Sequence, residues 1–338
     1  MLIKLNKMPS FYSYSAIGGS YEAEGPLGDL LDYVDKSNRF GQRTWEKSEA
    51  KMQDIALKYA MDKRGLSDSD VDLLFAGDLI NQCTSSGMGL VDYQIPFAGI
   101  YGACSTAALG LCLGAIALQC DGINRAAAVT SSHFCSAERQ FRYPLEYGSL
   151  RTPTSQHTVT GACAFILEEN RSDALITHVI FGQSIDSGIT DANNMGAAMA
   201  PAAADTIERF FKSSSFSPDD IGVILSGDLG YEGYTIVLEL MKQKGIPLST
   251  NYDDCGLRIY YRDSQQIQSG ASGCACSAIV LATQILPKIE SGELKSALFV
   301  GTGALLSKSS VLQGQSIAAI AHGLLIENRK HYEGRIKK

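Results

Sequence analysis

Charged residues are scarce in this chain, and the basic ones form no stripe. Lys, Arg, Asp and Glu together make up 19% of the 338 residues, and the formal net charge is −7. Because a phosphate backbone is bound by clustered Lys and Arg, this distribution argues against a nucleic-acid partner. The one basic cluster, residues 329–338, is expected to be a solvated end.

Paired Cys-x-x-Cys motifs are also missing. The chain has nine Cys, an odd number, and the spacing of Cys274 and Cys276 does not fit a zinc site. No signal peptide is recognised at the start of the sequence, which favours a reducing compartment. We therefore expect no structural disulfide, no metal site and no cofactor of the protein's own.

An uncharged run surrounds a potential nucleophile. Residues 93–120 carry no charged side chain, but Pro96 and several Gly, Ser and Thr favour a helix buried in protein over a transmembrane segment. Cys104 lies at the expected start of that helix, where backbone N–H groups and the helix dipole favour a thiolate or a bound anion. Cys104 and Ser105 are thus expected either to do chemistry or to hold a carboxylate.

The chain contains an internal duplication. Residues 66–79 resemble residues 216–229, and each copy has a polar turn, an apolar run typical of a central strand and a final Gly-Asp-Leu. Uncharged helices after Cys104 and Cys274 form a second pair in the same order. The pattern predicts two α/β halves, residues 1–171 and 172–338. Because both helices are apolar all round, we expect them to pack together between two sheets.

Duplicated halves, paired buried helices and a Cys at the first helix start resemble the thiolase superfamily. Runs that are similar to a sporulation family within it extend over nearly the whole chain, at residues 77–82, 102–106, 130–133, 137–144, 198–206, 253–256 and 272–278. The resemblance implies a thiolase-like five-layer αβαβα fold built from two duplicated halves. It also implies binding of dipicolinic acid, or of its calcium chelate, by the soluble subunit of a spore inner-membrane assembly that loads the forming spore. Such a protein would be cytoplasmic, peripheral at that membrane and, like many superfamily members, a homodimer.

The sequence departs from the catalytic pattern of that superfamily. Thiolases and ketoacyl synthases need His, or His with Asn, beside the nucleophile. Residues 268–273 and 226–229 lack the expected His, and residues 300–304 lack a second catalytic Cys. We therefore expect a catalytically degenerate binding protein with Cys104 as a vestigial nucleophile. The alternatives are an active acyl-CoA or acyl-thioester condensing enzyme that uses Cys104, and a structural subunit with an empty pocket.

Ligand-binding residues are expected from both halves. Dipicolinate is a planar dianion at neutral pH, so its site needs hydrogen-bond donors, cations and flat apolar walls. The candidates at strand ends and helix starts are Cys104, Ser105, Asp78, Asn81, Gln82, His133, His157, Ser272, Cys274 and His322. Asp78 could instead cap a turn, and each His could be an ordinary loop or core residue. Arg139, Arg142 and Arg151 could supply a cation or belong to a surface loop.

Overall fold

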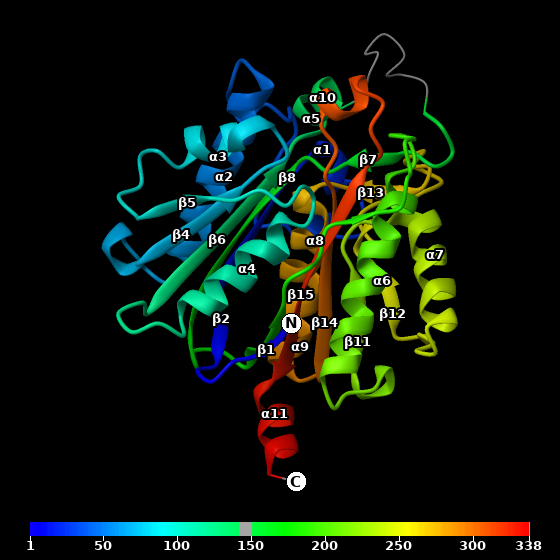
Figure 1. The fold of residues 1–338 in the computed structure, drawn as a ribbon. Helices are drawn as coiled ribbons and strands as arrows, with labels where there is room; N and C mark the ends of the chain where they lie inside the picture. Colours follow the sequence, from blue (N-terminus) through cyan, green and yellow to red (C-terminus); the bar gives the residue numbers. More distant parts are fainter. Residues whose placement is uncertain (142–150, 338) are drawn as a thin grey trace.

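The computed structural model describes residues 1–141 and 151–337. In these residues the main sheet has the strand order β12-β11-β14-β15-β9-β2-β8-β6-β4-β5 (Figure 1). Strands β9 and β2 are paired only at Leu175 and Ser10, so the sheet divides there into two parts of five strands.

The two parts have the same pairing pattern. The first consists of β2 (Pro9–Gly19), β8 (Gly161–Glu169), β6 (Arg125–Ser132), β4 (Leu73–Gly77) and β5 (Phe97–Gly99). The second consists of β9 (Ala174–Ile180), β15 (Ala318–Asn328), β14 (Ser296–Ala304), β11 (Val223–Ser226) and β12 (Tyr252–Asp254). In each part the first two pairings are antiparallel and the last two are parallel. This pattern agrees with a duplicated unit, while the predicted boundary at residue 171 stays a prediction.

Shorter strands complete the sheets. Beside the main path lie β1 (Leu2–Lys4) on β9, β3 (Tyr33–Asp35) on β2 and β10 (Ile185–Asp186) on β15. A separate parallel pair joins β7 (Gln156–Thr158) of the N-terminal part to β13 (Gly270–Ser272) of the C-terminal part. The two parts are therefore connected by backbone hydrogen bonds near the ends of their central strands.

Helices form the remaining three layers (Figure 1). The outer layers are α2 (Trp45–Asp62), which contacts β2, β6 and β8, and the pair α6 (Met195–Ser213) and α7 (Gly230–Gln243), in which α6 covers β14 and β15. The central layer is α4 (Thr106–Ala117), α8 (Cys274–Val280), a π-helical turn (Leu281–Ile285) and α9 (Leu286–Ser291). Helix α4 contacts β4 and β6 on one side, β14 and β15 on the other, and also α8. The predicted five-layer arrangement with paired central helices is confirmed.

Both copies of the duplicated turn are held by the same side-chain bonds. Ser67 and Asp70 form a capping box around a 3₁₀ turn (Asp68–Asp70), and Ser217 and Asp220 form another around Pro218–Asp220. In each box the Ser side chain accepts from the third backbone N–H and the Asp side chain accepts from the Ser N–H. The polar turn expected in each copy of the repeat is therefore present in the structure.

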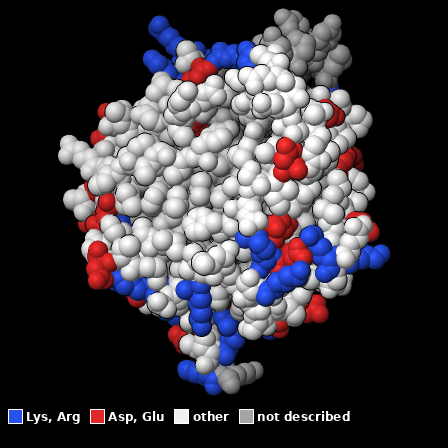
Figure 2. Space-filling model, viewed as in Figure 1, with Lys and Arg blue, Asp and Glu red and all other residues white. Residues whose placement is uncertain are grey.

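Small helices and turns complete the chain. They are α1 (Ser20–Ala23), Gly28–Leu30, Asn81–Cys83, α3 (Thr84–Gly89), α5 (Phe134–Phe141), Cys255–Leu257, α10 (Lys308–Leu312) and α11 (Arg329–Ile336). Helix α11 projects from the body at the end opposite α5 and α10 (Figure 1), and Figure 2 shows Lys and Arg side chains around it. Within the basic cluster, Arg329 pairs with Asp173 and Arg335 pairs with buried Glu327. The basic end is thus partly ion-paired rather than wholly solvated.

The core lies on both sides of α4. Leu111, Cys112 and Ala115 of this helix are fully buried between the two parts of the sheet. All nine Cys are free thiols. Within residues 1–141 and 151–337, no helix combines the length and the hydropathy needed to cross a membrane.

Candidate ligand-binding site at the Cys104 turn

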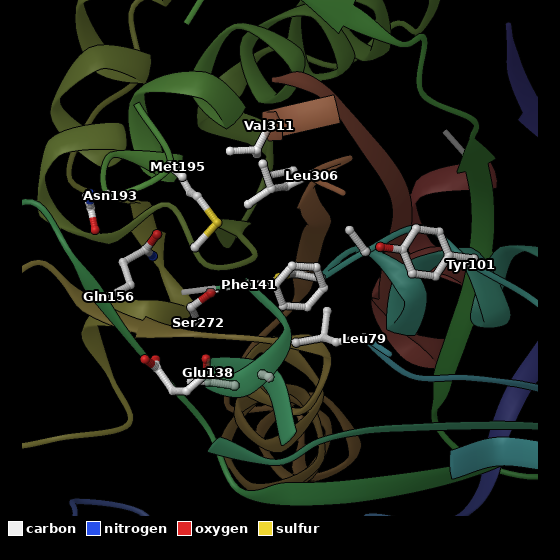
Figure 3. A pocket seen from close by; sticks show the side chains of 16 residues that line it. Leu79, Tyr101, Glu138, Phe141, Gln156, Asn193, Met195, Ser272, Leu306 and Val311 are labelled. Atoms are coloured by element: carbon white, nitrogen blue, oxygen red, sulfur yellow. Dashed lines mark hydrogen bonds between the residues drawn. The ribbon is translucent and has the colours of Figure 1, made fainter. Parts of the chain in front are cut away.

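A cavity of about 100 Å³ opens beside Cys104, where the two halves meet. Sixteen of the described residues line it (Figure 3). They come from the loop after β4, the turn before α4, α5, β7, β13, the start of α6 with the loop before it, and the segment from β14 to α10. The apolar lining consists mainly of Leu79, Phe141, Met195, Leu306 and Val311. The polar lining includes Gln156, Thr158, Ser272, Asn193 and Glu138. Because Gln156 and Ser272 lie on one side (Figure 3), the cavity has a polar end and apolar walls.

Cys104 is placed by a tight turn that precedes α4. Ala103 has a left-handed backbone (φ 50°), which is uncommon for a residue other than Gly. The N–H groups of Ser105 and Thr106 donate to the carbonyls of Gly102 and Ala103, both at 3.1 Å. Ser105 Oγ donates to the Gly102 carbonyl at 2.6 Å, so this hydroxyl closes the turn and does not line the cavity. The helix itself begins at Thr106, two residues after Cys104.

The C-terminal half holds this turn from behind. A Cβ added to Gly303 of β14 would lie 2.2 Å from the Gly102 carbonyl oxygen, so only Gly allows the strand to approach this closely. Cys274 Sγ lies 3.1 Å from the Ala103 carbonyl oxygen, to which it donates. The position of Cys104 therefore depends on both halves.

The carboxyl group of Asp228 accepts hydrogen bonds from polar groups at the base of the cavity. Its Oδ2 accepts from Ser272 Oγ at 3.1 Å and from the Gly273 N–H at 2.9 Å, and its Oδ1 accepts from Thr302 Oγ1 at 2.8 Å. Ser272 Oγ is also 3.8 Å from Cys104 Sγ. Asp228 is 1% exposed and lies behind the lining residues Cys104 and Ser272.

The electrostatics of this cluster differ from the expectation for a helix start. Burial, together with the negative charge of Asp228, raises the pKa of the Cys104 thiol well above its usual range. Burial also raises the pKa of Asp228 to about 6, against the lowering effect of its hydrogen-bond donors. The prediction that Cys104 gains acidity from the helix end was wrong, because desolvation and a nearby carboxylate raise the pKa of the thiol. These shifts keep the thiol protonated at neutral pH and bring the titration of Asp228 toward the neutral range.

Asp78, the counterpart of Asp228 in the duplication, has a different role. Its Oδ2 accepts from the Ser86 N–H at 2.8 Å and from Ser86 Oγ at 2.6 Å, and its Oδ1 accepts from the Ile80 N–H at 3.0 Å. Asp78 thus stabilises the entry into α3 and does not line the cavity. Its charge contributes, after burial, to the raised pKa of Cys274. The pair Asp78 and Cys274 is the counterpart of Asp228 and Cys104, but it lies outside the cavity lining.

The two predicted amides do not reach the cavity. Asn81 and Gln82 are both exposed, and Asn81 Oδ1 accepts from Gln140 Nε2 at 2.9 Å. Leu79, two residues before Asn81, does line the cavity. The expectation that both amides face the ligand is therefore not met, because the chain turns outward after Leu79.

His133 belongs to the packing of the first half. Its Nδ1 accepts from the Cys135 N–H at 3.1 Å, so its Nε2 donates to the Asn38 carbonyl at 2.9 Å. The ring packs against Trp45, with the ring centroids 5.1 Å apart. Both ring nitrogens are committed, and His133 does not line the cavity.

The other two predicted His residues are also placed by packing. His157 lies between the lining residues Gln156 and Thr158, but its ring stacks on Phe134 at 4.4 Å. His322 Nδ1 accepts from the Gly182 N–H at 3.2 Å, and burial, assisted by Arg209, lowers the pKa of His322 to about 4. Among the described residues, no His lines the cavity.

One of the three predicted Arg residues is close to the cavity. The Arg151 guanidinium is 3.8 Å from the carboxylate of Glu138, which is a lining residue. Arg139 instead pairs with Glu46 and is half exposed. Arg142 lies outside the described residues.

Gln156 and Asp228 were absent from the predicted ligand set. Gln156 is 5% exposed, and its Nε2 donates to the carbonyls of Asp228 and Ala271 at 2.5 and 3.1 Å. Its buried Oε1 has no hydrogen-bond partner among the described residues. The second Gly-Asp-Leu of the repeat was a usable signal for Asp228, whereas no sequence signal marked Gln156. Of the predicted ligand residues, the structure places Cys104 and Ser272 in the cavity lining.

Solved structures with a similar fold include one named as a condensing enzyme and one named as a synthase. The tetronic acid condensing enzyme AbyA1 matches with a TM-score of 0.60 and 15% identity, covering 95% of this chain and 100% of that chain. A 3-oxoacyl-[acyl-carrier-protein] synthase III from Aquifex aeolicus matches with a TM-score of 0.54 and 11% identity, covering 94% and 99%. A variant of OleA from Xanthomonas campestris matches with a TM-score of 0.58 and 13% identity, covering 95% and 99%. The protein therefore has a thiolase-like fold.

Sequence comparison defines the family within that fold. The family model of Stage V sporulation protein AD matches residues 2–327. The chain is 42% identical over 315 residues to Stage V sporulation protein AD of Bacillus subtilis (strain 168), covering 93% of each protein. The chain belongs to the Stage V sporulation protein AD family.

Proposed function

We propose that this chain binds dipicolinic acid, free or as its calcium chelate, in the cavity beside Cys104. The observation that carries the proposal is membership of a sporulation family over residues 2–327, combined with a Cys104 thiol whose pKa is raised well above its usual range by burial. The protein acts as the dipicolinate-binding subunit of an assembly at the spore inner membrane. Calcium would enter the cavity only as part of the dipicolinate chelate.

The lining of the cavity supports a flat, polar-ended ligand. Leu79, Phe141 and Met195 offer apolar surfaces, and Ser272 and Gln156 give one end hydrogen-bonding atoms. Small-molecule sites commonly combine such walls with a few polar groups that fix orientation. The Arg151 guanidinium lies 3.8 Å from Glu138, so the negative charge of this lining carboxylate is paired.

A condensing enzyme that acylates Cys104 is the second candidate, favoured by the fold shared with condensing enzymes. That chemistry needs a thiolate and a base that accepts its proton. Burial and Asp228 keep the pKa of Cys104 high, and no described lining residue is His. These features favour binding over acyl transfer.

The apolar edge of the first sheet supports the proposal of a homodimer. Strand β5 is the last strand of the sheet order, and Val91, Phe97 and Tyr101 around it are exposed. An edge strand with apolar side chains is a surface on which another strand can pair. The molar mass in solution checks this point.

Isothermal titration of purified protein with dipicolinate, with and without calcium, tests the proposed function. The wild type is expected to give saturable heat. Cys104→Ala should weaken binding about fivefold, which corresponds to roughly 1 kcal/mol, because it removes a polar group from the lining. Cys120→Ala, which removes an exposed thiol outside the lining, is the matched control and should bind like the wild type.

The competing chemistry has its own signature. Absence of heat from the wild type, together with a covalent acyl adduct on Cys104 after incubation with acyl-CoA, would refute the binding function. The same result would support the condensing enzyme.

A further inference from the structure

At the polar end of the cavity, Ser272 and Gln156 present acceptors where an anionic ligand needs donors. The Ser272 hydroxyl has one proton, which it donates to Asp228 Oδ2 at 3.1 Å. Its oxygen therefore presents only lone pairs to the cavity. Gln156 Nε2 is committed to two backbone carbonyls, so the amide group that remains available is the acceptor Oε1. A carboxylate placed here would meet lone pairs from both side chains.

A single proton on Asp228 changes what Ser272 presents, while Gln156 Oε1 stays an acceptor. Protonated Oδ2 can donate to Ser272 Oγ across the same 3.1 Å, and the Ser272 proton is then free to point into the cavity. We propose that Asp228 is a positioning residue that takes up one proton when an anionic ligand binds, and so converts Ser272 from acceptor to donor. The inference rests on the proposed function, because it takes the ligand to be a carboxylate such as dipicolinate.

The surroundings of Asp228 allow both protonation states. The Gly273 N–H and Thr302 Oγ1 donate to the carboxyl group and hold it in place whether or not it carries a proton. Other titratable groups that face it are Cys104 from the turn before α4, Cys276 from α8, Asp254 from β12 and Cys255 from the following 3₁₀ turn.

Asp254 is the other carboxyl group in this set, and it is engaged elsewhere. It accepts from Ser226 Oγ and from the N–H groups of Leu229, Gly230 and Gly256. It does not line the cavity. Because the pKa of Asp228 is already raised to about 6, proton uptake at pH 7 reduces the binding constant only about tenfold.

Proton linkage measured by titration calorimetry tests the inference. Free dipicolinate, without calcium, is titrated into the full-length protein at several pH values between about 6 and 8, in buffers of different ionisation enthalpy. We expect uptake of close to one proton per site at the upper end of this range. Above the pKa of Asp228, affinity should fall about tenfold for each pH unit.

Two substitutions of buried carboxyl groups separate the role of Asp228 from a general effect of charge. In Asp228→Asn the amide can donate to Ser272 permanently, so proton uptake should disappear and affinity should become independent of pH. Asp254→Asn removes the neighbouring carboxyl group outside the cavity, and proton uptake should persist. Ser272→Ala removes the hydroxyl group that links Asp228 to the ligand. This variant should therefore bind more weakly and take up no proton on binding.

The outcomes distinguish the inference from the proposed function. If the wild type binds dipicolinate with the same heat in every buffer, or if folded Asp228→Asn keeps the wild-type pH profile, the inference is wrong and the binding function stands. If Asp228→Asn does not fold, undiminished proton uptake by Ser272→Ala overturns the inference instead. Absence of binding by the wild type at every pH overturns the binding function itself.

Discussion

The carboxyl group of Glu49 in α2 should make the stability of this protein fall as pH rises. Its Oε1 accepts from Ser131 Oγ at 3.0 Å, and its Oε2 accepts from Ser136 Oγ at 2.6 Å. Burial, followed by the negative charge of Asp78, raises the pKa of Glu49 to about 8. Ser136 belongs to α5, which supplies Ala137 to the cavity, so this carboxyl group also anchors a wall of the site.

The direction of the effect follows from proton binding in the two states. In the unfolded chain Glu49 is ionised above pH of about 4.5, whereas in the folded protein it keeps its proton to about pH 8. Between these values unfolding releases a proton, so the free energy of unfolding falls as pH rises. The slope is about 1.4 kcal/mol per pH unit, and the whole effect is at most about 5 kcal/mol.

Glu49→Gln removes this titration. The variant should lose about 1.4 kcal/mol per pH unit of slope between about pH 5 and pH 8, and above about pH 8 it should be more stable than the wild type. Urea unfolding at a series of pH values measures the slope through the fluorescence of Trp45, the only Trp, which begins α2. Glu46→Gln on the same helix, where the carboxylate is ion-paired with Arg139, is the matched control. Equal slopes in the wild type and Glu49→Gln would refute the reasoning.

Two further predictions concern the Cys104 turn. Iodoacetamide at pH 8 should label exposed Cys120 in the folded protein and leave Cys104 unmodified. The reason is that burial and Asp228 raise the pKa of the Cys104 thiol. Comparable labelling of both residues in a peptide map would contradict this prediction. Gly303→Ala should lower the free energy of unfolding by roughly 2 kcal/mol and weaken dipicolinate binding, since the new Cβ meets the Gly102 carbonyl. A variant with wild-type stability in urea would show that β14 can move away without cost.

Much of the fold could be predicted from the sequence, because the repeat and the uncharged helices are local signals. The repeated Gly-Asp-Leu placed two strands correctly, and the apolar surface of α4 on all sides predicted its burial between sheets. Neither signal depends on which distant residues come into contact.

The site was harder to predict, because its geometry depends on distant donors. Asp78 and Asp228 occupy the same place in the repeat, yet the first is bound by nearby Ser86 and the second by Ser272, Gly273 and Thr302. Sequence therefore could not tell which carboxyl group lies behind the cavity lining. The acidity expected for Cys104 failed for a similar reason, since its burial and its contact with Asp228 arise only in the folded chain.

The contact between Gly102 and Gly303 has a consequence for the origin of the site. The turn that carries Cys104 comes from one half, while the strand behind it and the carboxyl group beneath it come from the other. A single unduplicated unit of this kind could complete such a cavity only by pairing with a second copy of itself, and that pair would contain two equal sites. Fusion of the two genes would have freed the sites to diverge. The packed arrangement of Cys274 and Asp78 corresponds to the site that was closed, and the cavity at Cys104 to the one that stayed open.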